Sequence, residues 1–516
     1  MNIVKEGPFN WSNLHMNYSR DIAGLYSLAN ATTGTPLENY NDATKGIQQI
    51  IADSIASGTP LKAVGGNWSL SPICSTTGII LNTKPLNTIF SISAGSAHSD
   101  FTGDANTIFL AQCGNGVWEL SNFLFQHGLS LPASGASNGQ TIVGAIATGT
   151  HGAGISFGAH QEAVIGLHII TGPTTSIWLE RQSVPVMSDA FAANLGASPV
   201  RDDEVFNAAL VSIGSFGFIH GVMIQAEADY LLECYLRRVP YDDAFKQQVT
   251  TLDFTYAHLP YPGEIPFHFQ SLINPYDIDN GAYMTVMYKR PYTTSYTPPR
   301  PNGAGIGPGD DAPAFIGKLT DALPALVPVL VNKVLAGSLT PYEKVFGRLA
   351  EIFNNTTISG KVASAAVGFS PQYAVTVMDM LMALNKTAGP FVGVFAFRFV
   401  KASGATMAFT RFAPTTCVLE LDGVQSDKTN QFYIAVWAQL DALNIPYTFH
   451  WGKMNTLTAD KVQSMYGPAL QRFLAARAGT VDASTLNIFN NDTLRSWGIE
   501  GTGFPGGAEA PVQVAL

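Results

Sequence analysis

Apolar residues early in the chain recur at helical spacing and then give way to a short strand. Steps of three and four residues predict one apolar helix face, formed by Ile47, Ile50, Ile51 and Ile55. We expect Asp42 to cap this helix at its start and Gly58 to end it. The sequence LKAV at residues 61–64 predicts a strand directly after it. That strand leads into a pair of glycines.

The same order of helix and strand returns further along the chain. Val117, Leu120 and Leu124 predict a second helix that Gly128 ends, and the sequence LSLP at 129–132 predicts a strand. Between residues 210 and 230, glycines lie among β-branched and aromatic residues. This pattern is expected where strands come close to a ligand.

Two glycine-rich segments follow the predicted strands. In the first, Gly65 and Gly66 precede Asn67, Trp68 and Ser69, and such a turn exposes consecutive N–H groups that can receive a phosphate. An ordinary turn between strand and helix is the alternative. The second runs from 135 to 154 and holds six glycines among Thr, Ser and Ala, so the backbone can approach an elongated ligand. A flexible loop is the alternative there, although its Ile and Val residues favour burial.

Composition narrows the class of protein. The chain has 516 residues, enough for two or three structural units. Hydrophobic residues make up 46% and charged residues only 13%, which excludes a disordered or coiled-coil chain. The net charge is −10 and no basic cluster interrupts it, so we expect no nucleic-acid partner. Small-molecule chemistry is the better expectation.

Compartment and membrane signals are weak. The N-terminal residues lack the apolar core of a secretory signal, so export is not expected. The most apolar stretch, 322–331, is ten residues long and contains two prolines, so no membrane span is expected. The four cysteines do not form a C-x-x-C pair, and we interpret them as reduced core residues of a cytoplasmic protein without a metal site: Cys74, Cys113, Cys234 and Cys417.

The three glycine-bearing segments, in this order, resemble the FAD-binding domain of the vanillyl-alcohol oxidase superfamily, also called the PCMH type. The sequence Thr150-His151-Gly152-Ala153-Gly154 is closest to aldonolactone oxidases, alditol oxidases and flavin-linked sterol oxidases. The resemblance implies an α+β fold with a two-part FAD-binding domain at 1–232 and 426–516. An inserted α/β substrate domain, or cap, is expected at 233–425.

The resemblance also implies the residues that hold FAD. The first glycine turn would take the pyrophosphate, the second segment the flavin and ribityl part, and the third the adenine end. The implied cofactor-binding residues are Gly65, Gly66, Asn67, Trp68, Ser69, Gly135, Ser137, Gly139, Thr141, Gly144, Thr148, His151, Gly152, Gly217, Ile219 and Asn490. The C-terminal part supports this, since His450-Trp451-Gly452-Lys453 and the later Phe489-Asn490 resemble elements of sugar and lactone oxidases.

This chain departs from the family at the flavin link. Many relatives bind FAD covalently through a histidine after the first glycine turn, and Trp68 stands at that position. Relatives with a second link use a cysteine, but residues 133–154 contain none. We therefore expect non-covalent FAD, with the Trp68 indole packed against the flavin edge.

A second departure concerns catalysis. Relatives carry an E-x-R sequence on a cap strand, whereas this chain has Ala396 before Arg398. Glu420 lies on the next strand, and we expect it to act as the base, with a solvent-facing edge position as the alternative. The weaker candidates for the base are His450 and Glu264, and His268 is better explained as a packed histidine. Lys453 would supply positive charge near the flavin, and Arg398 would hold the substrate oxygen.

These residues predict hydride transfer from a hydroxyl-bearing carbon to flavin N5. The low charge, the aromatic cap residues Phe267, Phe269, Tyr283 and Phe315, and Ala147 in place of a polyol-binding Ser predict a fairly apolar substrate. Oxygen or another electron acceptor would complete the cycle. Two alternatives stay open: an oxidative tailoring enzyme of a biosynthetic pathway, and a flavin-binding protein that has lost turnover. The oligomeric state does not follow from the sequence.

Overall fold

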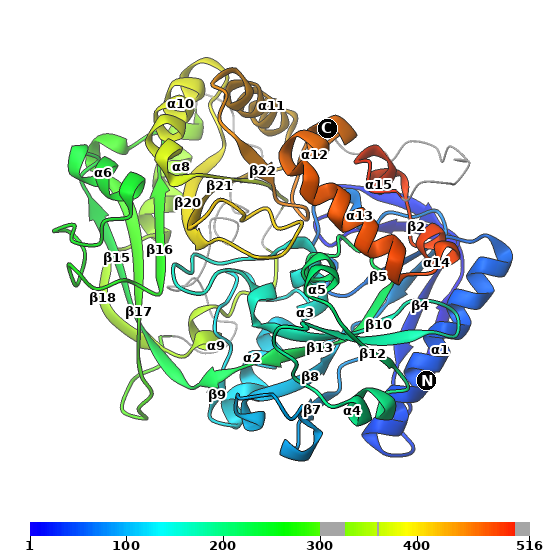
Figure 1. Cartoon of the computed structure of the whole chain (residues 1–516). Coiled ribbons are helices and arrows are strands. Elements are labelled where there is room, and N and C mark those ends of the chain that lie inside the picture. Colours follow the sequence, from blue (N-terminus) through cyan, green and yellow to red (C-terminus); the bar gives the residue numbers. More distant parts are fainter. Residues whose placement is uncertain (300–325, 359–360, 501–516) are drawn as a thin grey trace.

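The computed structural model describes residues 1–299, 326–358 and 361–500. The N-terminal part forms a four-stranded sheet in the order β1 (Asn2–Glu6), β4 (Gly24–Ala29), β6 (Ile79–Asn82) and β5 (Leu61–Val64). β1 pairs antiparallel with β4, and the other pairs are parallel. Helix α1 (Pro36–Ser57) packs its isoleucines on this sheet, and a hairpin of β2 (Phe9–Ser12) and β3 (Ser19–Ile22) lies beside it (Figure 1).

Helix α1 ends where the sequence predicts and begins earlier. Gly58 follows its last residue in the left-handed conformation, as expected. The predicted start at Asp42 is wrong, because the helix begins at Pro36. Thr35 accepts a hydrogen bond from the Glu38 N–H, and the Glu38 carboxylate accepts one from the Thr35 N–H. This capping box, with proline at the first position, is a stronger start signal than an aspartate six residues later.

A six-stranded sheet forms the second layer. Its order is β12 (Ser198–Arg201), β11 (Ser176–Glu180), β10 (Val164–Ile170), β13 (Phe218–Gln225), β8 (Ile108–Gln112) and β7 (Ile89–Ser91). Only the β11–β12 pair is parallel among the described strands of this sheet. Its helices are α2 (Val117–Gln126), α3 (Ile142–Thr148), α4 (Asp189–Asn194) and α5 (Asp203–Leu210). The predicted helix from Val117 and strand 61–64 are thereby confirmed.

An eight-stranded antiparallel sheet, here called the cap sheet, makes up most of the second half. Its order is β18 (Tyr342–Gly347), β15 (Tyr230–Val239), β17 (Ala282–Pro291), β16 (His268–Ile273), β20 (Gly393–Lys401), β21 (Thr415–Val424), β19 (Val362–Phe369) and β22 (Tyr447–Phe449). The expected cap boundaries fall inside β15 and just after β21, and β22 joins the same sheet from further along the chain.

Helices cover both faces of the cap sheet. Helix α8 (Val327–Ser338) packs with Val394 and Val424 on one face. Side chains of the opposite face, such as Phe395, join the large core that includes α6 (Asp243–Thr251), α10 (Ala374–Thr387) and α11 (Asp427–Ala442). Because neighbouring residues of a strand point to opposite faces, Val394 and Arg398 share a face, as do Glu420, Asp422 and Val424.

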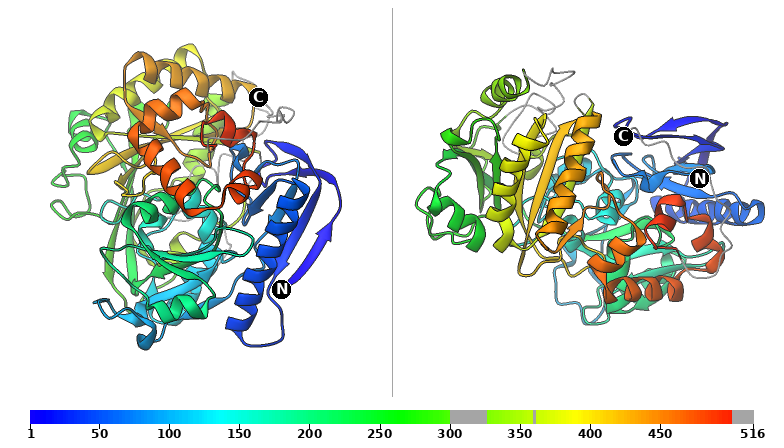
Figure 2. Two further views of the ribbon diagram at one scale, coloured as in Figure 1. Left: turned by 45° about the vertical axis from the view of Figure 1, so that its right-hand side comes forward. Right: turned by 90° about the horizontal axis from the view of Figure 1, so that it is seen from above.

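The C-terminal helices return to the N-terminal half. They are α12 (Ala459–Tyr466), α13 (Pro468–Thr480), α14 (Ala483–Ile488) and α15 (Asp492–Ser496). Helix α13 packs on α5, and α14 packs on α1. Figure 2 shows these orange and red helices against the N-terminal half of the molecule. The predicted α+β fold is confirmed by this arrangement and by the structural match reported below. The first unit consists of an N-terminal part and the returning C-terminal helices, and the cap is inserted between them in the sequence.

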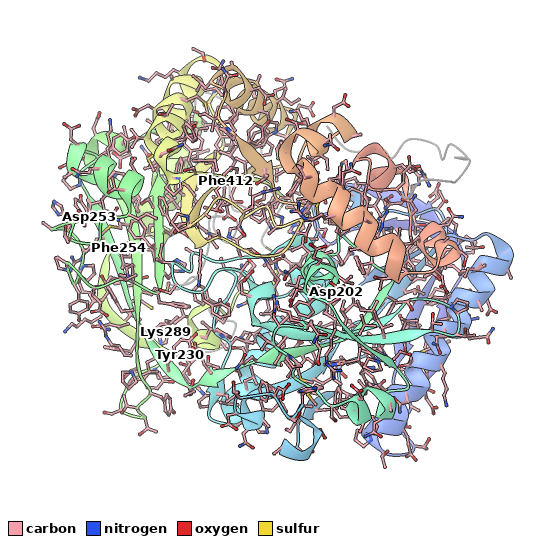
Figure 3. All side chains as sticks on the ribbon, viewed as in Figure 1. Asp202, Tyr230, Asp253, Phe254, Lys289 and Phe412 are labelled. Atoms are coloured by element: carbon pink, nitrogen blue, oxygen red, sulfur yellow. The ribbon has the colours of Figure 1, made fainter. Side chains whose placement is uncertain are left out.

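Polar contacts fasten the cap sheet to the first half. The Tyr230 hydroxyl donates to the Leu131 carbonyl oxygen at 2.8 Å. The Lys289 ammonium lies 4.3 Å from the Tyr230 ring centroid and donates to the Pro132 carbonyl oxygen. Tyr230 and Lys289 are labelled near the lower part of the cap sheet in Figure 3. A cation held over an aromatic face adds to the packing at this junction.

Helix α8 does not continue to Phe353, because β18 and the short α9 (Leu349–Ile352) follow it. Phe315, one of the aromatic residues from which an apolar substrate is predicted, lies outside the described residues. Across the described ranges, no helix has the length and apolar character that crossing a bilayer requires.

Candidate functional site

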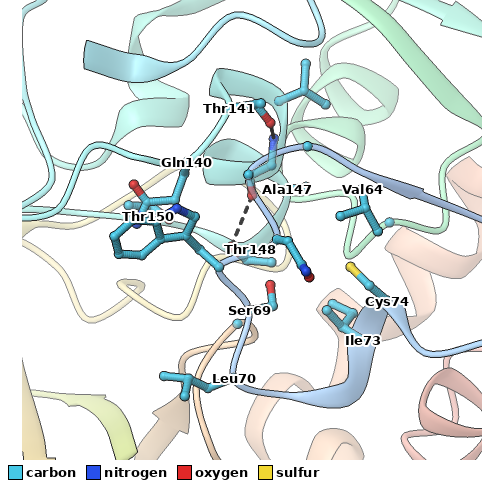
Figure 4. Close-up of a pocket in the computed structure, with 18 of the residues that line it drawn as sticks. Val64, Ser69, Leu70, Ile73, Cys74, Gln140, Thr141, Ala147, Thr148 and Thr150 are labelled. Atoms are coloured by element: carbon cyan, nitrogen blue, oxygen red, sulfur yellow. Dashed lines mark hydrogen bonds between the residues drawn. The ribbon is translucent and has the colours of Figure 1, made fainter. Parts of the chain in front are cut away.

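One cavity is lined by segments of the four-, six- and eight-stranded sheets. Its walls come from β5 and the turn after it, from α3 and the loop before it, from the loop between α5 and β13, and from the cap sheet. The space inside that no atom occupies is about 1590 Å³, its open mouth included. Figure 4 shows the side chains of Ser69, Leu70 and Ile73 along one stretch of this wall and those of Thr141 and Thr148 on another.

The turn after β5 is built from backbone in close contact. A Cβ atom on Gly66 would lie 2.6 Å from the Gly139 carbonyl oxygen, and one on Gly65 would lie 2.1 Å from the Thr141 hydroxyl. Asn67 has a φ of +59°, which turns the chain sharply. These positions therefore need glycine for space.

Trp68 lines the cavity and also packs against Gly139 and His15. Its indole lies so close to Gly139 that a Cβ atom there would be 2.3 Å from the ring. The His15 ring meets the indole edge-on at 5.7 Å between centroids. His15 also lines the cavity, is 7% exposed, and its Nδ1 lacks a hydrogen-bond partner among the described residues. Burial lowers the pKa of His15 to about 4.

The second glycine-rich segment contains a helix. Thr141 caps α3 by accepting a hydrogen bond from the Gly144 N–H, and the Thr148 hydroxyl donates to the Gly144 carbonyl oxygen (Figure 4). Ile142 and Ile146 are buried, which excludes the alternative of a flexible loop. The opposite side of α3 gives Gly144, Thr148 and their neighbours to the cavity wall.

A buried charged cluster closes the cavity at the cap side. Ala396 pairs directly with Glu420 across β20 and β21, which places Arg398 two residues along on the same face. The Arg398 Nη2 lies 2.9 Å from Glu420 Oε2, and the Arg398 Nε donates to the Gln270 side chain at 2.8 Å. Glu420 is 2% exposed. The alternative of a solvent-facing Glu420 is therefore wrong.

Lys453 completes the cluster from the turn after β22. Its Nζ donates to Glu420 Oε1 at 2.9 Å and lies 3.9 Å from Asp422 Oδ1, which accepts a hydrogen bond from the Ser364 hydroxyl. The Met454 N–H donates to the Ser364 carbonyl oxygen at 3.0 Å, so the backbone fixes the lysine against β19. Two cations and two carboxylates thus meet in a buried space.

Burial and charge set the protonation of the cluster. Burial opposes ionisation of Glu420, but the charges of Arg398 and Lys453 outweigh it and hold the pKa of Glu420 well below its ordinary value. Burial raises the pKa of Asp422. Burial also works against the charged form of Lys453, yet Glu420 and Asp422 raise its pKa, so it stays a cation.

Two histidines lie beside the cluster. His151 Nε2 is 3.6 Å from Glu420 Oε1, and its Nδ1 donates to the Gly152 carbonyl oxygen at 2.8 Å. The His450 ring lies 5.8 Å from that of His151, and its Nδ1 accepts a hydrogen bond from the Gly452 N–H. Burial lowers the pKa of both histidines, that of His151 to about 4, so both imidazoles are neutral near pH 7.

Most of the residues that the sequence nominates line this cavity. They include the four candidate catalytic residues, the whole first turn from Gly65 to Ser69, and Ser137, Thr141, Gly144, Thr148, His151, Gly217 and Ile219. Four do not line it. Gly139 lies under Trp68, Gly152 packs against the Ser134 carbonyl, Gly135 donates its N–H to His160, and the Asn490 side chain accepts from the next N–H.

Of the two weaker candidates for the base, His450 lines the cavity and Glu264 does not. Glu264 is exposed and paired with Arg290. His268 is buried, and burial together with Arg398 lowers its pKa to about 3. Phe267, Phe269 and Tyr283 are part of the packed core, so they do not shape the cavity directly as the sequence suggested.

Sequence reasoning missed several lining residues, among them His15, Lys62 and Ser364. Lys62 is the most unusual, because it sits in the short apolar strand β5, is 2% exposed, and its Nζ donates to the Gly214 carbonyl oxygen. A lone lysine inside an apolar strand was the available signal. No group of three His, Cys, Asp or Glu side chains with metal-binding geometry occurs in the described parts of the chain.

Comparison with known protein families matches one segment in the first half of the chain. Residues 42–179 match the family model described as an FAD binding domain. The chain therefore contains an FAD-binding domain. This match and the relatives below confirm the resemblance to the vanillyl-alcohol oxidase superfamily that the three glycine-bearing segments predict.

The sequence relatives carry the names of lactone oxidases. The D-arabinono-1,4-lactone oxidase of Kluyveromyces lactis is 26% identical over 175 residues, 34% of this chain and 28% of that protein. The L-gulonolactone oxidase of Bos taurus is 26% identical over 207 residues, 40% of each chain. The matched stretches span less than half the length of these curated relatives. The cholesterol oxidase structure from B. sterolicum covers 96% of this chain and 97% of its own, with a TM-score of 0.68 and 14% identity, which shows a shared fold.

The cavity fits FAD. The turn at Gly65 and Gly66 packs against Thr141 and Gly139, so both glycine-rich segments border one cavity and bring their backbone close to a bound dinucleotide. The buried ammonium of Lys62 adds positive charge on the β5 side. Unpartnered His15 Nδ1 offers a further polar contact. The cavity then extends without interruption to Arg398 and Glu420 at the cap sheet.

Proposed function

We propose that the protein is an FAD-dependent oxidoreductase that oxidises a hydroxyl group of a fairly apolar small molecule. When bound, FAD accepts a hydride at N5 and so oxidises the carbon that carries the hydroxyl. The observation that carries the proposal is the buried contact between Arg398 and Glu420 at the end of the FAD-binding cavity. The oxidases among the sequence relatives support it.

The chain's own groups have separate tasks in this reaction. Arg398 holds the substrate oxygen, because its guanidinium is fixed by Gln270 and Glu420 on one side and borders the cavity. Lys453 supplies positive charge that favours the negative charge arriving with the hydride. Glu420 faces the hydroxyl proton, and His450 borders the same space.

The proposed apolar character of the substrate rests on the cap-side wall. There the cap-sheet residues beyond the charged cluster are Val362 and Ser364, and Ala147 stands in the opposite wall. A polyol needs a donor or acceptor for each further hydroxyl, and of these three side chains only that of Ser364 offers one. A molecule with one reacting hydroxyl on an apolar frame fits better than a free sugar.

The pair Arg398 and Glu420 provides the test. Arg398→Met and Glu420→Gln should each lower kcat/KM by roughly 10²–10⁴, as for loss of a positioned charge or a proton acceptor. The double variant should lose much less than the product of the two effects, because the residues act together. Effects that multiply, or single variants with ordinary activity, would remove the pair from the reaction.

We propose that FAD is held without a covalent bond. Trp68 occupies the expected linking position and cannot form the bond, and residues 133–154 hold no cysteine. Acid precipitation should release the flavin into the supernatant, and the denatured chain should show no flavin fluorescence in a gel. If fluorescence stays on the chain, peptide mapping of the cavity histidines His15, His151 and His450 would locate the link that contradicts the proposal.

We propose further that oxygen accepts the electrons and that the protein works in the cytoplasm. Oxygen is the first candidate acceptor because the relatives carry the name oxidase, and peroxide release against dye reduction distinguishes it from another acceptor. The four cysteines are unpaired, which supports work in the reducing cytoplasm. Cell fractionation followed by immunodetection tests that location.

A further inference from the structure

His151 has a fixed tautomer. Its Nδ1 lies 2.8 Å from the Gly152 carbonyl oxygen, and a carbonyl oxygen can only accept. Nδ1 therefore carries the proton, and in the neutral ring Nε2 has a free lone pair. The side chain is 2% exposed, and the Phe409 ring meets it edge-on at 5.1 Å, so the ring cannot turn without disturbing its packing.

The free Nε2 faces another acceptor. It lies 3.6 Å from Glu420 Oε1, which already accepts a hydrogen bond from Lys453. Two acceptors at this separation repel unless a proton or a hydroxyl group comes between them or beside them. The residues around His151 thus leave a place at the cavity wall where a hydroxyl donor would be stabilised.

Of these two acceptors, His151 has the higher proton affinity. Burial lowers the pKa of His151 to about 4, although Glu420 acts to raise it. Glu420 already lies 2.9 Å from both the Arg398 Nη2 and the Lys453 Nζ, and these two cations hold its pKa below the ordinary value. A proton that leaves a hydroxyl here is therefore more stable on the imidazole, and Glu420 stabilises the imidazolium that results.

We propose that His151 Nε2 is the base that accepts the substrate's hydroxyl proton, while Glu420 positions and stabilises it. This inference rests on the proposed function and names a different residue for the proton. The O–H bond breaks, its electron pair stays on the oxygen beside Arg398, and an N–H bond forms at Nε2. The carbon loses its hydride to the bound flavin, which is the oxidant. After the product leaves, Nε2 returns the proton to solvent.

His450 differs from His151 in its hydrogen bonding. Its Nδ1 accepts from the Gly452 N–H at 3.0 Å, so its neutral ring carries the proton on Nε2. His450 can therefore donate from Nε2 but cannot accept there. The opposite tautomers assign the acceptor role to His151 and a donor role to its neighbour.

The test uses a substitution that keeps one hydrogen bond and removes the other. In His151→Asn, the amide nitrogen can take the place of Nδ1 and still donate to Gly152, but nothing replaces Nε2. His127→Asn is the matched control, because the His127 Nδ1 also contacts a backbone carbonyl, at 2.9 Å, on an exposed surface outside the cavity.

Anaerobic reduction of bound FAD by a hydroxyl substrate should slow by roughly 10²–10⁴ in His151→Asn and stay unchanged in His127→Asn. The variant's rate should then rise with pH, because hydroxide must take the proton, whereas the wild-type rate stays flat above about pH 6. FAD content should be equal in all three proteins. If His151→Asn keeps the wild-type rate and pH profile, this proposal is overturned but the proposed function is not. If no hydroxyl compound reduces the FAD bound to the wild-type protein, the proposed function is overturned, and this proposal with it.

A second readout does not depend on turnover. NMR of protein labelled with ¹⁵N at histidine reports which ring nitrogen carries the proton, and His151→Asn assigns the signal. We expect a neutral His151 protonated at Nδ1. A ring protonated at Nε2, or an imidazolium at neutral pH, would contradict the proposal whatever the kinetics show.

Discussion

Replacing Glu420 by glutamine removes one negative charge from between two buried cations. The change keeps the side-chain size, so the packing of β21 against β20 should survive. Glutamine can still accept from Lys453 or Arg398, but it cannot balance their charge. Both cations would then be held in a buried space with Asp422 as the nearest carboxylate to Lys453.

The magnitude follows from the two contacts. At 2.9 Å and an effective dielectric constant near 20, each pair attracts by about 6 kcal/mol. Much of this offsets the cost of burying the charges, and the Lys453 side chain, 18% exposed, recovers some hydration. Loss of one partner of a buried pair leaves a net destabilisation of about 3–5 kcal/mol, which we expect for Glu420→Gln.

Urea unfolding of the protein without FAD, with and without the substitution, measures this difference. The sign of the pH dependence follows from the lowered pKa of Glu420 in the folded state. Such a carboxylate stabilises the fold fully above its ordinary pKa of about 4.5, and the stabilisation fades as pH falls further. The difference between wild type and variant should therefore be largest near about pH 7 and shrink below about pH 4.

Two results would refute this reasoning. One is a glutamine variant as stable as the wild type at neutral pH, which would mean that water solvates the cluster or that the Asp422 carboxylate neutralises the two cations. The other is a constant difference at all pH values, which would mean a packing defect rather than a lost charge. Arg398→Met in the same background should couple to Glu420→Gln by about 0.5–3 kcal/mol.

Three further predictions concern the same structure. Gly66→Ala should lower FAD content and stability, because its Cβ would lie 2.6 Å from a backbone carbonyl oxygen, whereas Gly95→Ala, with open space around it, should do neither in absorbance and thermal unfolding. Lys453→Met should slow flavin reduction by roughly 10² in anaerobic stopped-flow while FAD stays bound; an unchanged rate would exclude its proposed role. Burial lowers the pKa of His160 to about 4, and burial with Arg398 lowers that of His268 to about 3, so both histidines should destabilise the fold as pH falls below about 6.5. Acid unfolding of the wild type and of His160→Gln checks this, because the variant should lose part of the pH-dependent destabilisation.

Local sequence signals predict the glycine turns and one face of each cap strand. Gly65 and Gly66 have no tolerance for a side chain, and the pair is visible in the sequence as a turn after an apolar strand, although an ordinary turn looks the same at this level. Arg398 and Glu420 lie on neighbouring strands, and they share a face only in one of the two possible registers, because alternate residues of a strand point to opposite faces. The pairing of Ala396 with Glu420 shows that the register is the one that brings them together.

Contacts between distant parts of the chain could not be predicted in this way. His151 and Glu420 are separated by 269 positions, and their 3.6 Å contact depends on how the cap sheet docks on the loop after α3. His15 reaches the Trp68 indole from the N-terminal hairpin, which has no periodic signal of its own. The helix start at Thr35 was visible locally, and a capping box should have outweighed the lone aspartate.

The most direct measurement is anaerobic mixing of the purified yellow protein with a panel of hydroxyl compounds, from sterols and other apolar alcohols to aldonolactones and polyols, while the visible absorption of oxidised FAD is followed. We predict that an apolar alcohol bleaches the flavin within the turnover time and that Arg398→Met abolishes the bleaching at the same FAD content. A flavin that a chemical reductant bleaches and every hydroxyl compound leaves oxidised would contradict the proposed function. It would favour a tailoring enzyme or a flavin-binding protein without turnover.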